Sequence, residues 1–131
     1  MIHGAAIRLL RYVRKEDVAS GIPGAQLSVL SVLVFGGPQT LGSLAAAEQV
    51  RPPSMSQTVG ELEKKGLAKR RPLDRRSSEI SVTEKGRRLL EAGRRRRLAT
   101  LTQALSGLSQ DKLQKLEESA YTIISVTDST I

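Results

Sequence analysis

The chain contains no cysteine, no tryptophan and a single histidine, His3. Without cysteine it cannot form a disulfide, a thiolate zinc site or a thiol that senses oxidants, which favours a reducing cytoplasm. One histidine is too few for a histidine-based catalytic triad or a histidine-rich metal site. The sequence also has no phosphate-binding loop and no dinucleotide-binding fingerprint. These absences argue against an enzyme, and we expect no catalytic residue, no cofactor and no metal.

Long apolar runs and aromatic side chains are also scarce. The longest apolar-leaning run, residues 27–35, is far shorter than the roughly 20 residues that span a bilayer. The first ten residues lack the apolar core of a secretory signal, so we expect a cytoplasmic protein with no membrane partner. Aromatic residues make up 2% of the 131 residues. The apolar content is therefore mostly aliphatic, which favours helices packed against one another in one domain.

Positive charge is abundant and confined to one part of the chain. The net charge is +8, and the segment from Lys64 to Arg97 holds 14 of the 21 basic residues but only four acidic ones. That segment therefore carries +10, whereas the rest of the chain sums to −2. A basic cluster is often only a solvated face. Its concentration in one segment favours a polyanionic partner.

Apolar periodicity and turn residues predict a series of helices. A first amphipathic helix ends before Gly21, and a second covers the apolar stretch up to the Gly36-Gly37-Pro38 cluster. Thr40 is a predicted N-cap for a short helix that begins at Leu41. Pro53 opens a further helix that runs to Gly66. Two short helices separated by a few residues indicate a helix-turn-helix.

The second helix of this pair has two different faces. Met55, Val59 and Leu62 share one face and are predicted to be core. The opposite face carries small or hydrogen-bonding residues, which suits entry into a major groove about 12 Å wide. Among them, Gln57 is the best candidate to contact a base, since its amide can pair with adenine N6 and N7. The alternative is that these are ordinary polar surface residues.

The next stretch predicts a β-hairpin with charge at its tip. Strands are expected at residues 67–71 and 79–82, joined by a loop at 72–78, and Thr83 is expected to cap the following helix. An arginine at such a tip can enter a minor groove, where negative potential is focused, and a neighbouring carboxylate such as Asp74 can fix its guanidinium. The alternative is that Asp74 only promotes the turn and the arginines are incidental. The complete set of predicted DNA-binding residues is Arg51, Ser54, Ser56, Gln57, Lys69, Arg70, Asp74, Arg75 and Arg76.

The C-terminal third predicts a dimer. Two apolar stripes at helical spacing are separated by a break at Gly107 and Ser109, and a domain of this size has little core to cover both. A second copy of the chain would cover them, and two-fold symmetry would present two binding helices to a pseudo-palindromic DNA site. Arg94 to Arg97 point all around their helix, so they are expected to be solvated or paired with acids such as Glu117 and Glu118, with DNA contact as the alternative.

These features together resemble the MarR family of winged helix-turn-helix transcriptional regulators. The specific part is the spacing of Asp74, Arg76 and Thr83-x-x-Gly86 after the "LEKKG" motif. The resemblance implies a homodimer with interlocked terminal helices, a recognition helix in the major groove, Arg76 in the minor groove, and a small aromatic or anionic effector. Three residues depart from the family pattern: Gln57 stands where a basic residue is common, Gly60 where an acid is common, and Pro52 where a capping Ser or Thr is expected.

The expected fold class is mainly α (α+β): a winged helix-turn-helix with a two-stranded β-wing and N- and C-terminal dimerisation helices. Residues 1–131 form a single domain, with a DNA-binding lobe at 25–86 and dimerisation helices at 1–20 and 87–131. The predicted function is a sequence-specific regulator of double-stranded DNA, a repressor that a small effector releases. The alternative is an architectural nucleic-acid-binding protein without sequence preference. The shortage of aromatic residues disfavours a protein that stacks on single-stranded RNA.

Overall fold

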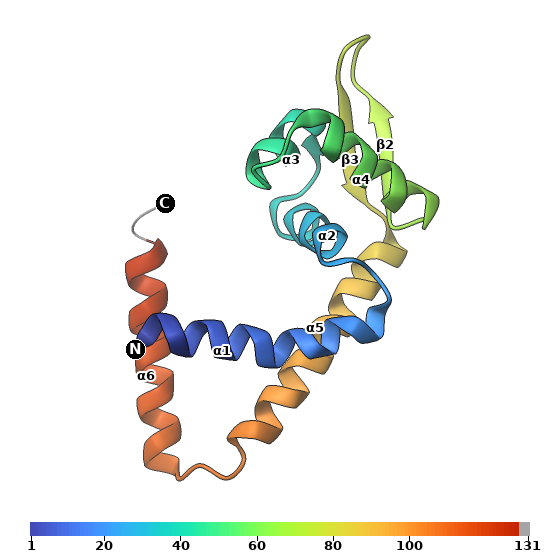
Figure 1. The fold of residues 1–131 in the computed structure, drawn as a ribbon. Helices are drawn as coiled ribbons and strands as arrows, with labels where there is room; N and C mark the ends of the chain where they lie inside the picture. Colours follow the sequence, from blue (N-terminus) through green and yellow to red (C-terminus); the bar gives the residue numbers. More distant parts are fainter. Residues whose placement is uncertain (129–131) are drawn as a thin grey trace. The chain divides into compact units, whose positions relative to one another are not determined.

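The computed structural model describes residues 1–128 and forms two compact units, Met1–Arg97 and Leu98–Ile131. Helix α5 belongs to both units. The elements follow the order α1 (Ile2–Arg14), the 3-10 helix η1 (Lys15–Ser20), α2 (Gly24–Gly36), β1 (Gln39–Thr40), α3 (Leu41–Ala47), α4 (Pro52–Lys64), β2 (Ala68–Pro72), β3 (Ser78–Val82), α5 (Glu84–Leu105) and α6 (Gln110–Asp128) (Figure 1). The chain is mainly helical, as predicted.

The sheet has three antiparallel strands in the order β1-β3-β2. Strands β2 and β3 form the predicted hairpin, in which Arg70 lies opposite Ile80. Strand β1 pairs with the other edge of β3, where Gln39 lies opposite Ile80. The predicted two-stranded wing is therefore confirmed, and β1 is an additional strand that was not predicted. Strand β1 has two residues, too few to show the alternation of apolar and polar side chains that indicates a strand.

The core lies in the first unit, between α2, α3, α4 and the sheet. Met55, Val59 and Leu62 of α4 are at most 2% exposed, which confirms the predicted inner face of this helix. They belong to one cluster with Val29, Leu30, Leu33, Leu44, Ala45, Leu67, Ala68, Ile80 and Leu90. Burying a side chain of this size contributes about 1.5–3 kcal/mol relative to leaving it exposed. Burial of this face therefore sets the rotation of α4 about its own axis. That rotation also determines which residues of α4 point outward.

The two helices of the helix-turn-helix begin in different ways. The Thr40 hydroxyl accepts a hydrogen bond from the Ser43 N–H at 3.2 Å, so the predicted N-cap of α3 is confirmed. Helix α4 begins at Pro52, one residue before the predicted start, and its N-cap residue Arg51 makes no side-chain capping bond. Proline is tolerated here because the first N–H groups of a helix have no partner within the helix.

Thr83 and Gly86 join the start of α5 to the end of α4. The Thr83 hydroxyl donates to the Gly66 carbonyl at 2.6 Å and accepts from the Gly86 N–H at 3.1 Å, which confirms the predicted cap. A Cβ atom on Gly86 would lie 2.2 Å from the Leu67 carbonyl oxygen. No side chain fits at that distance, so only glycine allows α5 to approach the backbone before β2 this closely.

The terminal segments bury little apolar surface. The first helix is interrupted: α1 ends at Arg14 and a 3-10 helix follows to Ser20, with Gly21 at a φ of 68°. Neither α1 nor α6 contains a buried residue. In the second unit, the predicted break between the long helices is confirmed, and the Ser109 hydroxyl accepts from the Lys112 N–H at 3.3 Å at the start of α6.

No single helix within residues 1–128 is both long enough and apolar enough to cross a membrane. The segments Ile2–Ser20 and Gly24–Gly36 would be long enough and apolar enough only when taken together, and a bend of 95° separates them.

Replacing Gly86 with alanine should destabilise the fold by about 1–3 kcal/mol, because the added methyl group forces α5 away from the Leu67 carbonyl. Urea unfolding followed by circular dichroism measures the change. Gly42→Ala is the matched control, since a Cβ there has nothing within 4 Å and alanine is the better helix former. Equal stability of the two variants would contradict the steric argument.

Candidate nucleic-acid interface

The outer face of α4 presents short polar side chains. Ser54 and Gln57 are exposed and Ser56 is half-buried, so the structure places the three predicted groups on the N-terminal half of the helix. Arg51, also predicted, is exposed directly before the first turn. The Ser54 carbonyl accepts a bond from the Thr58 hydroxyl at 3.1 Å. No long charged side chain follows Arg51 before Gln57, so the leading surface of the helix is compact enough for a major groove.

Gln57 has a neighbour that the sequence did not reveal. Its amide nitrogen donates to the Glu61 Oε1 atom at 3.5 Å, one turn further along α4. This is a long hydrogen bond, and it uses one of the two N–H groups of the amide. The second N–H and the carbonyl oxygen are left to pair with a base edge.

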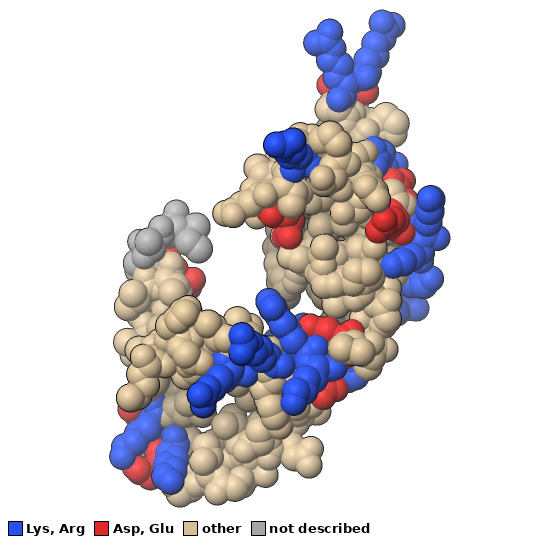
Figure 2. All heavy atoms as spheres, in the orientation of Figure 1, with Lys and Arg blue, Asp and Glu red and all other residues tan. Residues whose placement is uncertain are grey.

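The β2–β3 hairpin extends beyond the helices of its unit (Figure 1), and basic side chains project from its tip (Figure 2). Arg75 and Arg76 lie in this loop, and both are exposed. The Ser77 carbonyl closes the loop by accepting from the Leu73 N–H at 3.0 Å and from the Asp74 N–H at 3.3 Å. We call the segment from β2 to β3 the wing.

Asp74 organises the backbone of the wing tip. Its Oδ1 atom accepts from the N–H of Arg76 at 2.7 Å and from the N–H of Ser77 at 2.8 Å. Within residues 1–128, no ion pair joins this carboxylate to a guanidinium, so the contact with Arg76 is made through the main chain rather than through the charged group. The backbone bond to Arg76, followed by bonds to the Ser77 side chain and backbone, lowers the pKa of Asp74 below 3.8.

The two predicted basic residues of β2 differ in their surroundings. Lys69 is exposed, whereas the Arg70 Nε atom lies 3.2 Å from the Glu63 Oε1 atom of α4. Arg70 and Arg76 also line a hollow of about 420 Å³ between the wing and the start of α3. The ion pair orients Arg70 toward α4, and the sequence did not indicate this contact.

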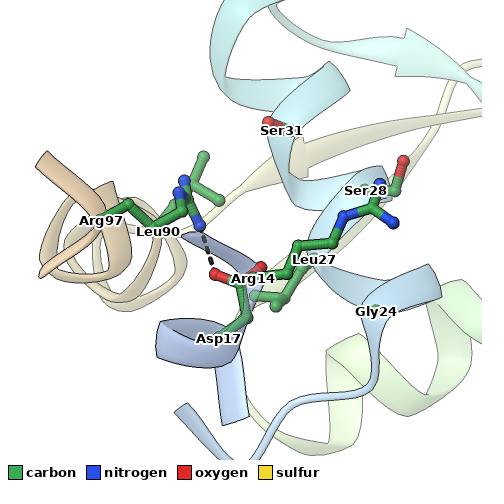
Figure 3. A pocket seen from close by; sticks show the side chains of 8 residues that line it. All are labelled: Arg14, Asp17, Gly24, Leu27, Ser28, Ser31, Leu90 and Arg97. Atoms are coloured by element: carbon green, nitrogen blue, oxygen red, sulfur yellow. Dashed lines mark hydrogen bonds and ion pairs between the residues drawn. The ribbon is translucent and has the colours of Figure 1, made fainter. Parts of the chain in front are cut away.

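A second hollow lies on another side of the lobe, between η1, α2 and α5 (Figure 3). It has a volume of about 460 Å³, and its polar lining includes Arg14, Asp17, Ser28 and Arg97. Arg97 forms an ion pair with Asp17, drawn as a dashed line in Figure 3. The arginines at 94–97 were expected to be solvated or paired with acids such as Glu117 and Glu118; Arg97 is paired with an acid, but that acid is Asp17. Its partner is 80 residues away in the sequence and only the fold brings the two together.

Within the described range of the chain, no group of three or more His, Cys, Asp or Glu side chains could hold a metal ion.

Asp74 should titrate below 3.8 in the folded protein, because protonation costs it the bonds to the two N–H groups. With a folded pKa below the unfolded one, these bonds stabilise the loop above pH 3.8 and are lost as the pH falls through the folded value. NMR titration of the carboxyl carbon and of the Arg76 and Ser77 amide protons measures both effects. Asp74→Ala should shift the same amide signals at neutral pH, and an ordinary pKa would contradict the assignment.

Comparisons with known proteins agree with this architecture. Residues 20–77 match a family model described as the MarR family. An uncharacterized HTH-type transcriptional regulator of Mycobacterium leprae, ML2140, is 36% identical over 126 residues, which cover 95% of this chain and 88% of the relative.

Two solved structures are also similar. The transcriptional regulator Tm0710 from Thermotoga maritima has a TM-score of 0.82 at 25% identity, and the match covers 98% of this chain and 92% of Tm0710. NadR in complex with 4-hydroxyphenylacetate has a TM-score of 0.66 at 22% identity, and the match covers 93% of this chain and 88% of NadR. The chain therefore belongs to the MarR family of transcriptional regulators and has the DNA-binding, winged helix-turn-helix fold of that family.

Proposed function

We propose that the protein is a homodimeric, sequence-specific repressor that binds a pseudo-palindromic site in double-stranded DNA. It acts in the cytoplasm and has no enzymatic activity. The observation that carries the proposal is that one lobe presents both a compact polar helix face, with Ser54 and Gln57, and an ordered basic wing tip. A major groove admits such a helix, and the adjacent minor groove attracts an arginine.

Each predicted residue has a role in this arrangement. Gln57 contacts a base edge, with Ser54 and Ser56 beside it. Arg76 enters the minor groove from a loop that Asp74 holds in shape. Arg51, Lys69 and Arg75 are exposed and contact phosphates, which positions the protein without selecting a sequence. The Nε atom of Arg70 is bonded to Glu63, which offsets part of its charge, so its contribution is the smallest of the set.

The dimer rests on apolar surface that the single chain leaves uncovered. Leu9 and Leu10 of α1 are 49% and 51% exposed, and Ile123 and Ile124 of α6 are 46% and 52% exposed. Each helix, taken by itself, is amphipathic and lacks a buried residue. A two-fold symmetric partner would cover such faces and place two copies of α4 about one helical turn of DNA apart.

A small anionic ligand is the proposed effector. Its site is the hollow between η1, α2 and α5, where Arg14 supplies positive charge beside the apolar Leu27 and Leu90, and where Arg97 is paired with Asp17 (Figure 3). That lining suits an aromatic carboxylate, the chemical class of the 4-hydroxyphenylacetate in the NadR complex. Binding can release DNA only if the ligand prefers the DNA-incompetent form of the dimer.

Sequence preference separates this proposal from the architectural alternative. A regulator prefers one duplex over random DNA by about a thousandfold or more, whereas an architectural protein depends on charge and deformability. Selection from a random duplex library followed by binding measurements gives the ratio. A ratio near one would leave only the architectural function.

Three alanine variants should separate the roles of the interface residues. Arg76→Ala should cost about 1–3 kcal/mol and weaken the preference for A·T-rich flanks, because it removes recognition of groove shape. Arg75→Ala should weaken binding equally on all duplexes and reduce the salt slope by about one. Gln57→Ala should relax selection at one or two base pairs and leave the salt slope unchanged. Fluorescence anisotropy on a panel of duplexes at two salt concentrations distinguishes these outcomes. If Arg76→Ala binds every duplex as the wild type does, the wing has only a structural role.

Ile124→Asp should weaken the dimer at least tenfold and DNA binding with it, since it places a charge on the uncovered apolar face of α6. Sedimentation velocity over a range of protein concentrations measures the association. Ser119→Asp is the control, because Ser119 is exposed on the same helix and lies about 140° around it from Ile124. Unchanged dimerisation of Ile124→Asp would show that α6 is not in the interface.

A further inference from the structure

Among the described residues, Gln26 is the only one with a polar side chain that is buried in the core. It lies in the first turn of α2 and is 4% exposed, while the other members of the buried set are apolar. A buried amide costs free energy unless its hydrogen bonds are made. At this buried position, the NH2 group of Gln26 therefore needs a hydrogen-bond acceptor and its carbonyl oxygen needs a donor.

The structure supplies both partners from α4 and its C-terminal end. The Gln26 Nε2 atom donates to the Glu61 Oε2 atom at 2.6 Å, and the Gln26 Oε1 atom accepts from the Lys65 ammonium at 2.6 Å. A carboxylate can only accept and an ammonium can only donate, so the two charged partners determine which end of the amide faces which way. Bonds to charged groups are the stronger kind.

Glu61 extends this contact to the exposed face of α4. While its Oε2 atom is held by Gln26, its Oε1 atom accepts from the Gln57 amide. Lys65, Gln26, Glu61 and Gln57 thus form a continuous hydrogen-bonded chain from the core to the residue proposed to contact a base. Without Gln26, Glu61 would lose its anchor and Gln57 would regain rotamer freedom that binding must then remove.

We propose that Gln26 is a positioning residue for base recognition, acting through Glu61 to hold the Gln57 amide in the orientation that selects its base pair. The inference rests on the proposed contact between Gln57 and DNA. It assigns a specificity-determining role to a side chain that itself never reaches the DNA, and it connects that role to α2 rather than to the recognition helix alone.

The first step of the test locates the base pair. A preferred duplex is selected from a random library with the wild-type protein, and every single-base variant of one half-site is then measured. Gln57→Ala should abolish selection at one or two positions. If Gln57→Ala shows the same selection profile as the wild type, Gln57 does not contact a base and this inference is overturned. The proposed function is not overturned by that result, because other residues would then provide the sequence preference.

The second step tests Gln26 itself. Gln26→Met keeps the volume but removes both hydrogen bonds, and it should reduce selection at the Gln57 positions by about tenfold, with the other positions and the salt slope unchanged. Adding Gln26→Met to Gln57→Ala should cause no further loss at these positions, because Gln26 acts only through Gln57. Ala25→Ser is the matched control, because Ala25 precedes Gln26 in the first turn of α2 and is exposed. A wild-type profile for Gln26→Met, or a loss spread evenly over all positions, would overturn the inference.

Exchanging the two groups provides a rescue. In Q26E/E61Q the carboxylate accepts from both the new amide and Lys65, so the chain of bonds is restored with one direction reversed. Selection at the Gln57 positions should return toward the wild-type value. If Gln26→Met does not fold, Glu61→Ala takes its place, since Glu61 is only half-buried, and the same tenfold loss is expected. Failure of the double exchange to recover selection in a folded protein would also count against the inference.

Discussion

The inner face of α4 is the constraint on which the interface depends. Met55, Val59 and Leu62 are buried against α2 and the sheet, and this burial sets the rotation of the helix about its axis. Because side chains on a helix are separated by about 100°, fixing one face also fixes where Ser54 and Gln57 point. The polar residues on the outer face of α4 therefore need few contacts of their own, because the buried residues orient the helix.

Local signals in the sequence were enough to predict most of this lobe. Thr40 and Thr83 were identified as caps because a hydroxyl before a helix has a partner two or three residues away, and Met55 was assigned to the core from its spacing. The start of α4 at Pro52 and the two-residue strand β1 were not predicted, because short or uncapped elements carry little local pattern.

The side-chain partners were harder to predict, for a physical reason. Asp74 bonds to main-chain groups near it in sequence, but a carboxylate beside arginines indicates an ion pair equally well. Arg97 with Asp17, and Gln26 with Glu61, join residues 80 and 35 positions apart. Such pairs are determined by tertiary packing, so no periodicity in the sequence reveals them. The residues proposed to contact DNA were predicted from the sequence, and both the contacts and their individual roles stay predictions.

The junction at Thr83 and Gly86 has a mechanical consequence. Thr83 bonds to Gly66, the Thr83 N–H donates to the Leu67 carbonyl at 3.0 Å, and the Lys85 ammonium donates to the Lys65 carbonyl at 2.8 Å. The first turn of α5 is thus clamped to the end of α4, with no room for a side chain between them. Any change in the direction of the first turn of α5 would therefore be passed directly to the C-terminal end of α4.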